Sequence, residues 1–286
     1  MSDAPNPQPL AVLKFGGDVV ADQARLHAVV TEVAQLIGEG WRFILCHGGN
    51  PQANALSARL RLERKQVGGR RITDAATLQV MKQVLAGEAN VDVVAAAAAA
   101  GISAVGLSGV SAGTITAVRR PPRIFSGCGD EPVDFGFVGE ITAIRTGLLE
   151  HLLMGGYTPV LNTLGITAEG EGEHCICQVF NINADTVSSA LAATLGADHL
   201  FLMTGVPGVL CDIEDPSSRL PHLNEADARQ AIRDGVIVGG MIPKIEEALK
   251  QLKAGIGAIH ILGNTPGALL AEAHLSGSVG TALTLE

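Results

Sequence analysis

The 286-residue chain has few aromatic residues, few lysines and no excess of positive charge. Aromatic residues make up 3% of it, so we expect no platform on which single-stranded nucleic acid stacks. Lys and Arg number 20 against 29 Asp and Glu, a net charge of −9, which argues against a nucleic-acid partner and a polybasic membrane surface. The uncharged stretch 93–118 is dominated by Ala, Gly, Ser and Thr, so a membrane-spanning helix is not expected either.

Signals for secretion and for common nucleotide-binding folds are also missing. The N-terminus has no basic segment followed by an apolar run. Five cysteines, an odd number at irregular spacing, fit reduced thiols, so we expect a cytoplasmic protein. Neither the pattern G-x-x-x-x-G-K-[ST] nor G-x-G-x-x-G between a strand and a helix is present. These absences disfavour a P-loop ATPase and a nicotinamide-dependent dehydrogenase.

Short apolar runs alternate along the chain with segments whose apolar residues recur at helical spacing. Strands are predicted at Leu10–Phe15, Arg42–Cys46, Ile102–Leu107, Pro159–Leu161, His199–Met203 and Ala258–Ile261. Helices are predicted at Ala24–Ile37, Gln52–Leu62, Ala75–Ala86, Asp185–Leu195 and Ile242–Ala254. This alternation predicts an α/β fold whose open, mostly parallel sheet is covered on both faces. Hairpins are predicted at 119–138, and a linker-like stretch at 165–174 places a boundary between two lobes near 177–181.

Three of the predicted strands end at or close to a glycine turn, namely at Gly16, Gly48 and Gly205. Such turns let the backbone approach a ligand, and a helix that follows presents its free N–H groups to an anion. Lys14 precedes the Gly16-Gly17 turn, and Lys244 follows another glycine pair at the start of a predicted helix. Because open α/β sheets bind ligands at the carboxyl ends of their strands, these turns and lysines predict a phosphate-binding site.

Seven short blocks, taken in order, resemble the amino acid kinase family over about Leu10 to Leu285. The blocks are Lys14-Phe-Gly-Gly, His47-Gly-Gly-Asn-Pro, Arg71-Ile-Thr-Asp, Val138-Gly-Glu-Ile, Asn181-Ile-Asn-Ala-Asp, Gly205-Val-Pro-Gly-Val and Gly239-Gly-Met-Ile-Pro-Lys. The resemblance implies a three-layer αβα sandwich with two lobes. Residues 1–178 would bind the acyl substrate and form a homodimer, and residues 179–286 would bind ATP.

The same resemblance implies transfer of the ATP γ-phosphoryl group to the side-chain carboxylate of N-acetyl-L-glutamate, as in arginine biosynthesis. Mg²⁺ would be held mainly through the nucleotide phosphates, with no metal ligand set in the protein. Carried over by position, the catalytic residues would be Lys14, Lys244 and Asp185. The substrate-binding residues would be Gly49, Asn50, Arg71 and Asn181. Phosphate and nucleotide would contact Gly16, Gly17, Gly48, Gly205, Gly208, Gly240 and Met241.

The chemistry of this reaction agrees with such a site. A carboxylate nucleophile, with a solution pKa of about 4.3, is already ionised near neutral pH and needs no general base. The difficulty is repulsion between two anions, about 4 kcal/mol for unit charges roughly 4 Å apart at an effective dielectric of about 20. Two lysines on different loops are suited to offset that repulsion, and Arg71 is suited to bind a carboxylate through two hydrogen bonds.

Three residues depart from the pattern of the family, namely Asp18, Asn50 and Gly205. They leave open a catalytically silent family member that acts as a binding subunit. A second alternative, a kinase for an aminoadipate derivative in lysine biosynthesis, is open for a different reason. One methylene is worth only about 1–3 kcal/mol in a specificity pocket, so the sequence does not separate the two substrates. The resemblance implies that arginine-regulated members carry an extra N-terminal helix and an acidic-Gly stretch before the final Gly-Thr. The N-terminus here is short and proline-rich and the end reads Ser276–Thr281, so we expect a homodimer that arginine does not inhibit.

Overall fold

The structure, a computed structural model, describes residues 8–68, 70–124, 131–169, 176–212, 215–237 and 241–286. The strands are β1 (Leu10–Phe15), β2 (Arg42–His47), β3 (Gln66–Val67), β4 (Arg70–Arg71), β5 (Ala104–Ser108), β6 (Ile115–Arg119), β7 (Gly139–Ile144), β8 (Thr158–Asn162), β9 (Leu164–Glu169), β10 (Ile176–Asn181), β11 (His199–Thr204), β12 (His222–Leu223), β13 (Ala258–Gly263) and β14 (Thr281–Leu283). The α-helices are α1 (Gly17–Ala21), α2 (Gln23–Gly38), α3 (Asn50–Arg59), α4 (Ala75–Gln83), α5 (Ala89–Ala99), α6 (Gly147–Met154), α7 (Ala184–Leu195), α8 (Glu225–Arg233), α9 (Met241–Lys253) and α10 (Ala268–His274).

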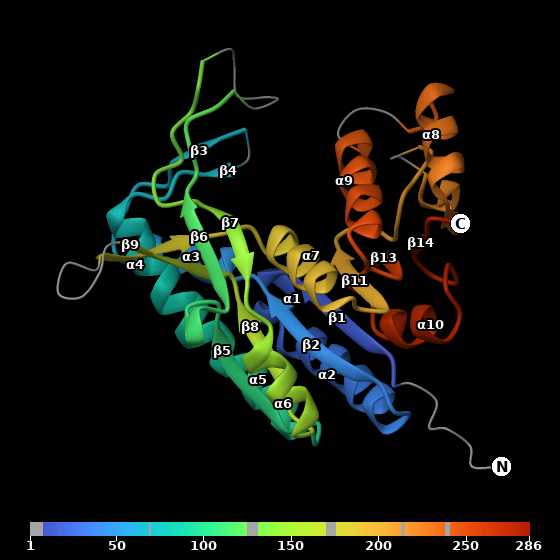
Figure 1. Cartoon of the computed structure of the whole chain (residues 1–286), viewed down its shortest axis with the longest axis horizontal. Coiled ribbons are helices and arrows are strands. Elements are labelled where there is room, and N and C mark those ends of the chain that lie inside the picture. The colour runs from blue at the N-terminus through green and yellow to red at the C-terminus, as the bar shows by residue number, and fades with distance from the viewer. Residues whose placement is uncertain (1–7, 69, 125–130, 170–175, 213–214, 238–240) are drawn as a thin grey trace.

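A single large sheet runs through the molecule in the order β12-β14-β13-β11-β1-β2-β8-β5 (Figure 1). The pair β13–β14 is antiparallel, and the other neighbouring pairs are parallel. The predicted mostly parallel sheet is therefore confirmed. The sheet divides between β1 and β11. The half that contains β1 is built from strands within residues 10–162, and the half that contains β11 is built from strands within residues 199–283.

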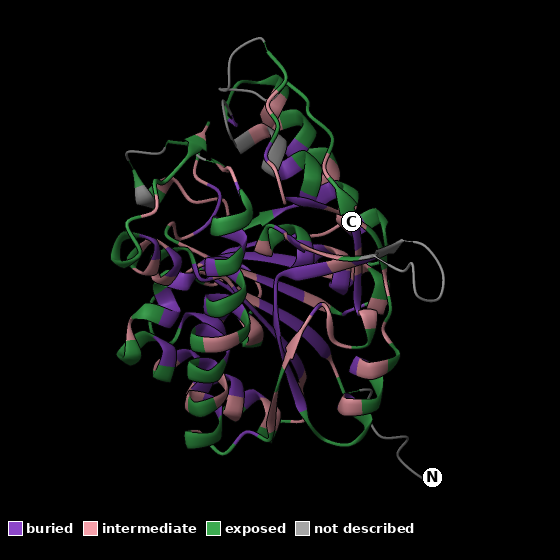
Figure 2. Cartoon of the chain, turned by 90° about the vertical axis from the view of Figure 1, so that its left-hand side faces the viewer, coloured by how far each residue is buried: buried purple, intermediate pink, exposed green. Residues whose placement is uncertain are grey.

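Alternation along β1 separates two hydrophobic cores, one on each face of the sheet. Ala11, Leu13 and Phe15 pack into a core with α2, α5 and α10. Leu10 and Val12 point the other way, into a core with α6, α7 and α9. Helices thus cover both faces, and the central strands are buried along most of their length (Figure 2). This arrangement is the three-layer αβα sandwich that the resemblance implies.

The helices connected to the two central strands, β1 and β11, lie on opposite faces of the sheet. α2, which leads from β1 to β2, packs on one face, whereas α7, which precedes β11, packs on the opposite face. Adjacent connections therefore diverge at the carboxyl end of β1. In open α/β sheets this divergence opens a crevice in which ligands bind.

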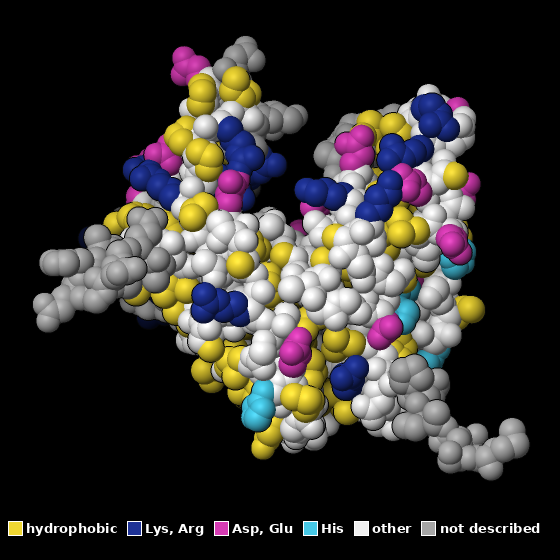
Figure 3. Space-filling model, viewed as in Figure 1, with side chains coloured by type: hydrophobic (Ala, Val, Ile, Leu, Met, Phe, Trp, Pro, Cys, Tyr) yellow, Lys and Arg dark blue, Asp and Glu magenta, His cyan; other side chains and the backbone are white. Residues whose placement is uncertain are grey.

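Two projections rise above the carboxyl edge of the sheet (Figure 1). One contains the hairpin β3–β4 and the segment between β6 and β7, and the other contains α8 and α9. A smaller sheet, β10-β9-β6-β7, lies beside the first projection. In the space-filling view a deep notch separates the projections, with Lys and Arg side chains on both of its walls (Figure 3).

The helix boundaries differ from the sequence prediction by more than one residue in two places. α3 begins at Asn50, earlier than predicted, because Gly49 caps it and Pro51 occupies its first turn; it ends before Arg61, whose φ is 57°. The helix predicted at Ala75–Ala86 instead continues through a π-helical turn, Val84–Glu88, directly into α5. Of the predicted hairpins, the antiparallel bridge between Arg123 and Val133 is present, and residues 125–130 lie outside the described residues.

Short 3₁₀ turns occupy Ser111–Gly113 and Pro216–Ser218. Within the described ranges, none of the helices combines the length and the apolarity needed to cross a bilayer. The thiols of Cys46, Cys177 and Cys211 are free.

Candidate active site

A cleft of about 260 Å³ opens at the carboxyl ends of β1 and β2. Nine of the residues singled out from the sequence line it: Lys14, Gly16, Gly17, Gly48, Gly49, Asn50, Arg71, Asn181 and Asp185. They come from β1, β2, β4, β10 and the loops and helices that follow, so the fold gathers residues that are far apart in the sequence.

Lys14 and Asp185 form an ion pair in the cleft, with 2.8 Å between Lys14 Nζ and Asp185 Oδ1. The side chain of Lys14 is 12% exposed, whereas that of Asp185 is 58% exposed. Lys14 reaches the cleft because it is the penultimate residue of β1, and Asp185 because it lies in the first turn of α7. The carboxylate therefore orients an ammonium group whose stem is held in the sheet.

The two glycine loops after β1 and β2 touch through their backbones. A Cβ on Gly17 would lie 2.7 Å from Gly49 Cα and 2.9 Å from Asn50 N. Real Cβ atoms do not come this close to backbone atoms, so the loops pack this tightly only because residue 17 has no side chain. Gly48 adds to the contact, since its N–H donates to Phe15 O at 3.1 Å.

Besides the short α1, which starts at Gly17, two longer helices begin at the cleft. α3 starts at Asn50, directly after the Gly48-Gly49 loop, and α7 starts at Ala184. Asn183 caps α7 by accepting hydrogen bonds from Asp185 N at 2.7 Å and Thr186 N at 3.4 Å. The N-terminal turns of both helices direct positive dipole ends toward the space in which an anion would bind.

Arg71 forms the opposite side of the cleft from β4. Its Nη2 donates to Asn54 Oδ1 at 2.5 Å and to Asn50 Oδ1 at 3.4 Å. Its Nε is buried and has no hydrogen-bond partner among the described residues. Burial, together with the nearby charge of Arg64, lowers the pKa of the Arg71 guanidinium from its ordinary value. A ligand carboxylate would supply both the missing acceptor and the missing negative charge.

Asn181 ends β10, and its Nδ2 donates to Thr73 Oγ1 at 3.3 Å. Thr73 is buried, and its carbonyl accepts from Phe137 N at 2.7 Å. These contacts fix the amide of Asn181 against the chain beside α4, where it lines the cleft.

The comparisons with known proteins agree with this geometry. A model of the amino acid kinase family matches residues 9–263. Over 273 residues the chain is 50% identical to a protein named acetylglutamate kinase from Sorangium cellulosum (strain So ce56), covering 95% of this chain and 93% of that protein. The chain belongs to the amino acid kinase family.

A second relative and a solved structure extend the comparison. A protein named acetylglutamate kinase from Anaeromyxobacter dehalogenans (strain 2CP-C) is 47% identical, covering 95% of this chain and 98% of that protein. Among solved structures, N-acetylglutamate synthase from Neisseria gonorrhoeae complexed with coenzyme A and N-acetyl-glutamate superposes with a TM-score of 0.75 at 22% identity, covering 97% of this chain and 60% of that chain. At this identity the superposition supports the amino acid kinase fold alone.

Among the other cleft residues of this family member, Arg120 and Phe135 were not singled out from the sequence. Arg70, Arg120, Phe135 and Val138 line the cleft from the projection that contains β3 and β4. Burial, followed by the charges of Arg123 and Arg70, lowers the pKa of Arg120. Val138 opens one of the family blocks, but neither Arg120 nor Phe135 belongs to a sequence motif that would identify it as a cleft residue.

Two residues predicted to contact nucleotide lie away from the cleft. Gly205 and Gly208 follow β11, and neither lines the cleft. A Cβ on Gly208 would lie 2.6 Å from Thr281 Oγ1 and 3.1 Å from Arg219 Cδ, so this glycine packs against β14 and its neighbours. The side chains of Lys244 and Met241, and all of Gly240, lie outside the described residues, although Met241 and Lys244 belong to α9.

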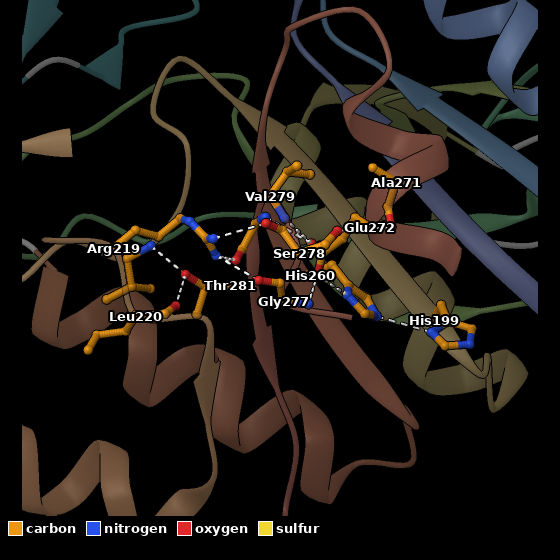
Figure 4. A network of polar contacts seen from close by, with 12 residues as sticks. His199, Arg219, Leu220, His260, Ala271, Glu272, Gly277, Ser278, Val279 and Thr281 are labelled. Atoms are coloured by element: carbon orange, nitrogen blue, oxygen red, sulfur yellow. Dashed lines mark hydrogen bonds and ion pairs between the residues drawn. The ribbon is translucent and has the colours of Figure 1, made fainter. Parts of the chain in front are cut away.

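The segment around Gly208 is held by a buried polar network (Figure 4). Arg219 donates to the carbonyls of Gly277, Ser278 and Gly280, while Thr281 Oγ1 accepts from Val209 N at 2.8 Å. From the other side, the buried carboxylate of Glu272 accepts from the N–H groups of residues 277, 279 and 280 and from His260. Burial raises the pKa of Glu272, but these hydrogen bonds outweigh it and leave the pKa below its usual value.

Asp18, the acidic residue beside the first glycine loop, is bound to a residue that follows β13. Its Oδ2 accepts from Asn264 Nδ2 at 3.0 Å, and it is not a lining residue. Of the charged side chains that line the cleft in the described part of the chain, four are positive (Lys14, Arg70, Arg71 and Arg120) and one is negative (Asp185). The cleft of this family member is therefore suited to anionic ligands, although the chain as a whole carries a charge of −9.

Proposed function

We propose that the protein transfers the γ-phosphoryl group of ATP to the side-chain carboxylate of N-acetyl-L-glutamate. The observation that carries this proposal is the distribution of cations in the cleft, with Lys14 held by Asp185 on one side and Arg71 on the other. The relatives named acetylglutamate kinase, up to 50% identical over 95% of the chain, support the choice of substrate.

The proposed step is an attack by a carboxylate oxygen on the γ-phosphorus. An O–P bond forms to the acceptor, and the bond between the γ-phosphorus and the bridging oxygen breaks, so that ADP and an acyl phosphate leave. The acceptor is already an anion near neutral pH, so the protein need not remove a proton. Lys14 and the N–H groups of the glycine loops would offset the charge on the phosphoryl oxygens, and Arg71 would bind the other carboxylate of the substrate.

The donor set of the cleft fits ATP as the source of the phosphoryl group. Backbone N–H groups at two helix N-termini and an ammonium group are what a triphosphate requires. Mg²⁺ would be held mainly through the nucleotide phosphates, which is its usual mode in kinases, and it would neutralise charge there. Within the described residues no three His, Cys, Asp or Glu side chains are grouped as a metal cage.

Trapping of the product tests this proposal. Hydroxylamine converts an acyl phosphate into a hydroxamate, which forms a coloured complex with added ferric iron, so incubation with MgATP and N-acetyl-L-glutamate should yield hydroxamate and ADP in equal amounts. A parallel incubation with N-acetyl-L-aminoadipate tests the one-carbon-longer alternative. Turnover of the longer acid alone would reassign the substrate, and a folded protein with no turnover on either would point to a catalytically silent binding subunit.

Assembly and location complete the proposal. The residues 1–178 and 179–286 would be two lobes, because the strands of the sheet divide between them on either side of the β1–β11 pair. A homodimer formed through the first lobe is part of the proposal, as the family resemblance implies. Light scattering coupled to gel filtration tests the dimer, and an assay with added arginine tests the predicted absence of inhibition. The free thiols fit the cytoplasm.

A further inference from the structure

The imidazole of His47 is fully buried directly before the Gly48-Gly49 loop of the cleft. Its Nδ1 lies 3.1 Å from Gly48 O, and its Nε2 lies 3.0 Å from Asn90 Nδ2. The same Asn90 amide nitrogen donates to Val160 O at 3.1 Å. Four polar groups from β2, α5 and β8 thus form one unbranched chain beneath the cleft.

The direction of every proton in this chain follows from its two ends. Gly48 O and Val160 O are carbonyls, which only accept hydrogen bonds. His47 Nδ1 must therefore carry the proton, which leaves Nε2 of the neutral ring as an acceptor. Asn90 Nδ2 has two protons and supplies one to His47 and one to Val160. No other assignment of donors satisfies all three contacts.

Burial is consistent with a neutral ring. It lowers the pKa of His47 to about 4, and only the hydrogen bond with Gly48 O acts in the opposite direction. The position of Asn90 is also built into the fold, because a Cβ on Gly106 of β5 would lie 2.3 Å from Asn90 Oδ1. A glycine at 106 therefore leaves the room that this amide occupies.

The hydrogen bond to Gly48 O fixes the plane of the Gly48–Gly49 peptide. In a trans peptide the C=O and the following N–H point in opposite directions. With its carbonyl turned toward His47, the peptide directs the Gly49 N–H away from the ring. In the part of the chain that the structure describes, that N–H has no protein acceptor, and Gly49 lines the cleft.

The other side of Gly49 is held as well. A Cβ on Gly49 would lie 3.0 Å from side-chain atoms of both Val84 and Leu85, which belong to the π-helical turn that leads into α5 and Asn90. One continuous segment thus contacts the loop directly through these side chains and indirectly through Asn90 and His47.

We propose that His47, locked as the Nδ1–H tautomer by Asn90, is a positioning residue that aims the Gly49 N–H at the phosphoryl group or the acceptor carboxylate in the cleft. Its catalytic consequence rests on the proposed phosphoryl transfer, whereas the tautomer and the orientation of the peptide do not. A preorganised backbone donor of this kind is typically worth about 10²–10³-fold in rate.

The tautomer is measured directly by long-range ¹H–¹⁵N correlation in uniformly labelled protein. The expected spectrum has a protonated Nδ1 and an unprotonated Nε2 for His47 near neutral pH. A protonated Nε2 would overturn the proposal whatever the activity of the protein.

Two substitutions separate positioning from packing. In His47→Asn the amide nitrogen is as many bonds from Cα as Nδ1 is, so the donor to Gly48 O is retained. In His47→Gln the amide nitrogen instead matches Nε2, so the donor to Gly48 O is lost. Val93→Ala, a buried truncation in α5 outside the cleft, serves as the control for destabilisation alone.

We expect His47→Asn to keep kcat/KM within about threefold of the unsubstituted protein, and His47→Gln to lower it about 10–100-fold with a shifted Gly49 amide resonance. The two variants should melt at similar temperatures. If both lose activity only in proportion to their loss of melting temperature, on the same relation that Val93→Ala defines, His47 only packs and the proposal fails. If the unsubstituted protein has no phosphoryl-transfer activity, the proposed function fails, while the tautomer and the Gly49 resonance still decide the role of His47.

Discussion

Lys14 on β1 and Asp185 on α7 come from opposite halves of the chain, yet their charged atoms lie 2.8 Å apart in the cleft. The pair joins the central sheet to the helix that covers one of its faces. Because Asp185 is more than half exposed, the pair adds little to folding stability, and its value lies in orienting the ammonium group.

Replacement of Lys14 by Met should therefore affect rate far more than stability. We expect kcat to fall at least about 10²-fold, because one cation that offsets charge in the transition state is lost. Steady-state kinetics and thermal melting, measured side by side, check this.

Lys253→Met is a matched control, since Lys253 Nζ lies 2.7 Å from Glu225 Oε1 in a surface ion pair. It should leave kcat unchanged, because neither residue lines the cleft. Equal kinetic effects of the two substitutions would contradict the role assigned to Lys14.

The second carboxylate of the substrate should be recognised by Arg71. Arg71→Met should raise KM for N-acetyl-L-glutamate about 10–100-fold, because a charged hydrogen-bonded contact worth about 1.5–3 kcal/mol is lost. The decisive comparison uses 4-acetamidobutanoate, which lacks the α-carboxylate but keeps the acceptor. The substitution should change KM for this analogue little, and an equal increase for both substrates would place the carboxylate elsewhere, with Arg120 the next candidate.

The parts of the site that sequence patterns predicted are those tied to local structure. Gly16, Gly17 and Gly49 come after apolar strands and before helices. In a parallel sheet such turns lie at the carboxyl ends of the strands, which is where ligands bind. Lys14 was found for the same reason. The family blocks added Arg71 and Asn181, which no local rule places in the cleft.

The residues that were missed depend on long-range packing. Arg120 and Phe135 enter the cleft because the segment between β6 and β7 folds over it, with Thr73 N donating to Phe135 O at 3.0 Å. Asn90 was not distinguished from its neighbours, because its role exists only once Gly106 on β5 makes room for it. Such contacts are set by how strands pair, which a single sequence specifies only weakly.

Two glycines, one in the contact between the glycine loops and one in an open position on α2, should respond in opposite ways to substitution by alanine. Gly17→Ala should destabilise the protein by about 1–3 kcal/mol, because the new methyl meets backbone atoms of Gly49 and Asn50 that have no room to move. Gly38→Ala should instead stabilise it by about 0.5–1 kcal/mol, since Gly38 is in α2 with nothing within 4 Å of a Cβ. Denaturant unfolding measures both, and equal stability of Gly17→Ala and the parent would mean that the loops are not in contact.

Stability should also fall as the solution is acidified from about pH 7 to about pH 5. Burial lowers the pKa of His47 from 6.5 to about 4, so the unfolded chain binds a proton in this interval that the folded protein does not. The contribution of His47 to the free energy of unfolding is therefore full above about pH 6.5, decreases below it, and stops decreasing near pH 4. By pH 5 the loss from His47 is about 2 kcal/mol.

Other groups act in the same direction and must be separated from His47. Burial, followed by the charge of His260, lowers the pKa of His199 to about 4, so His199 adds to the loss over the same interval. Glu272 acts only below its ordinary value of 4.5, because its pKa in the folded protein is lower still. Urea unfolding of His47→Asn between pH 7 and pH 5 isolates His47: its slope should be shallower than that of the parent by about 2 kcal/mol over the interval, with the contribution of His199 retained. Identical slopes would mean that His47 takes up a proton in the folded protein, which the chain of hydrogen bonds from Gly48 to Val160 does not permit.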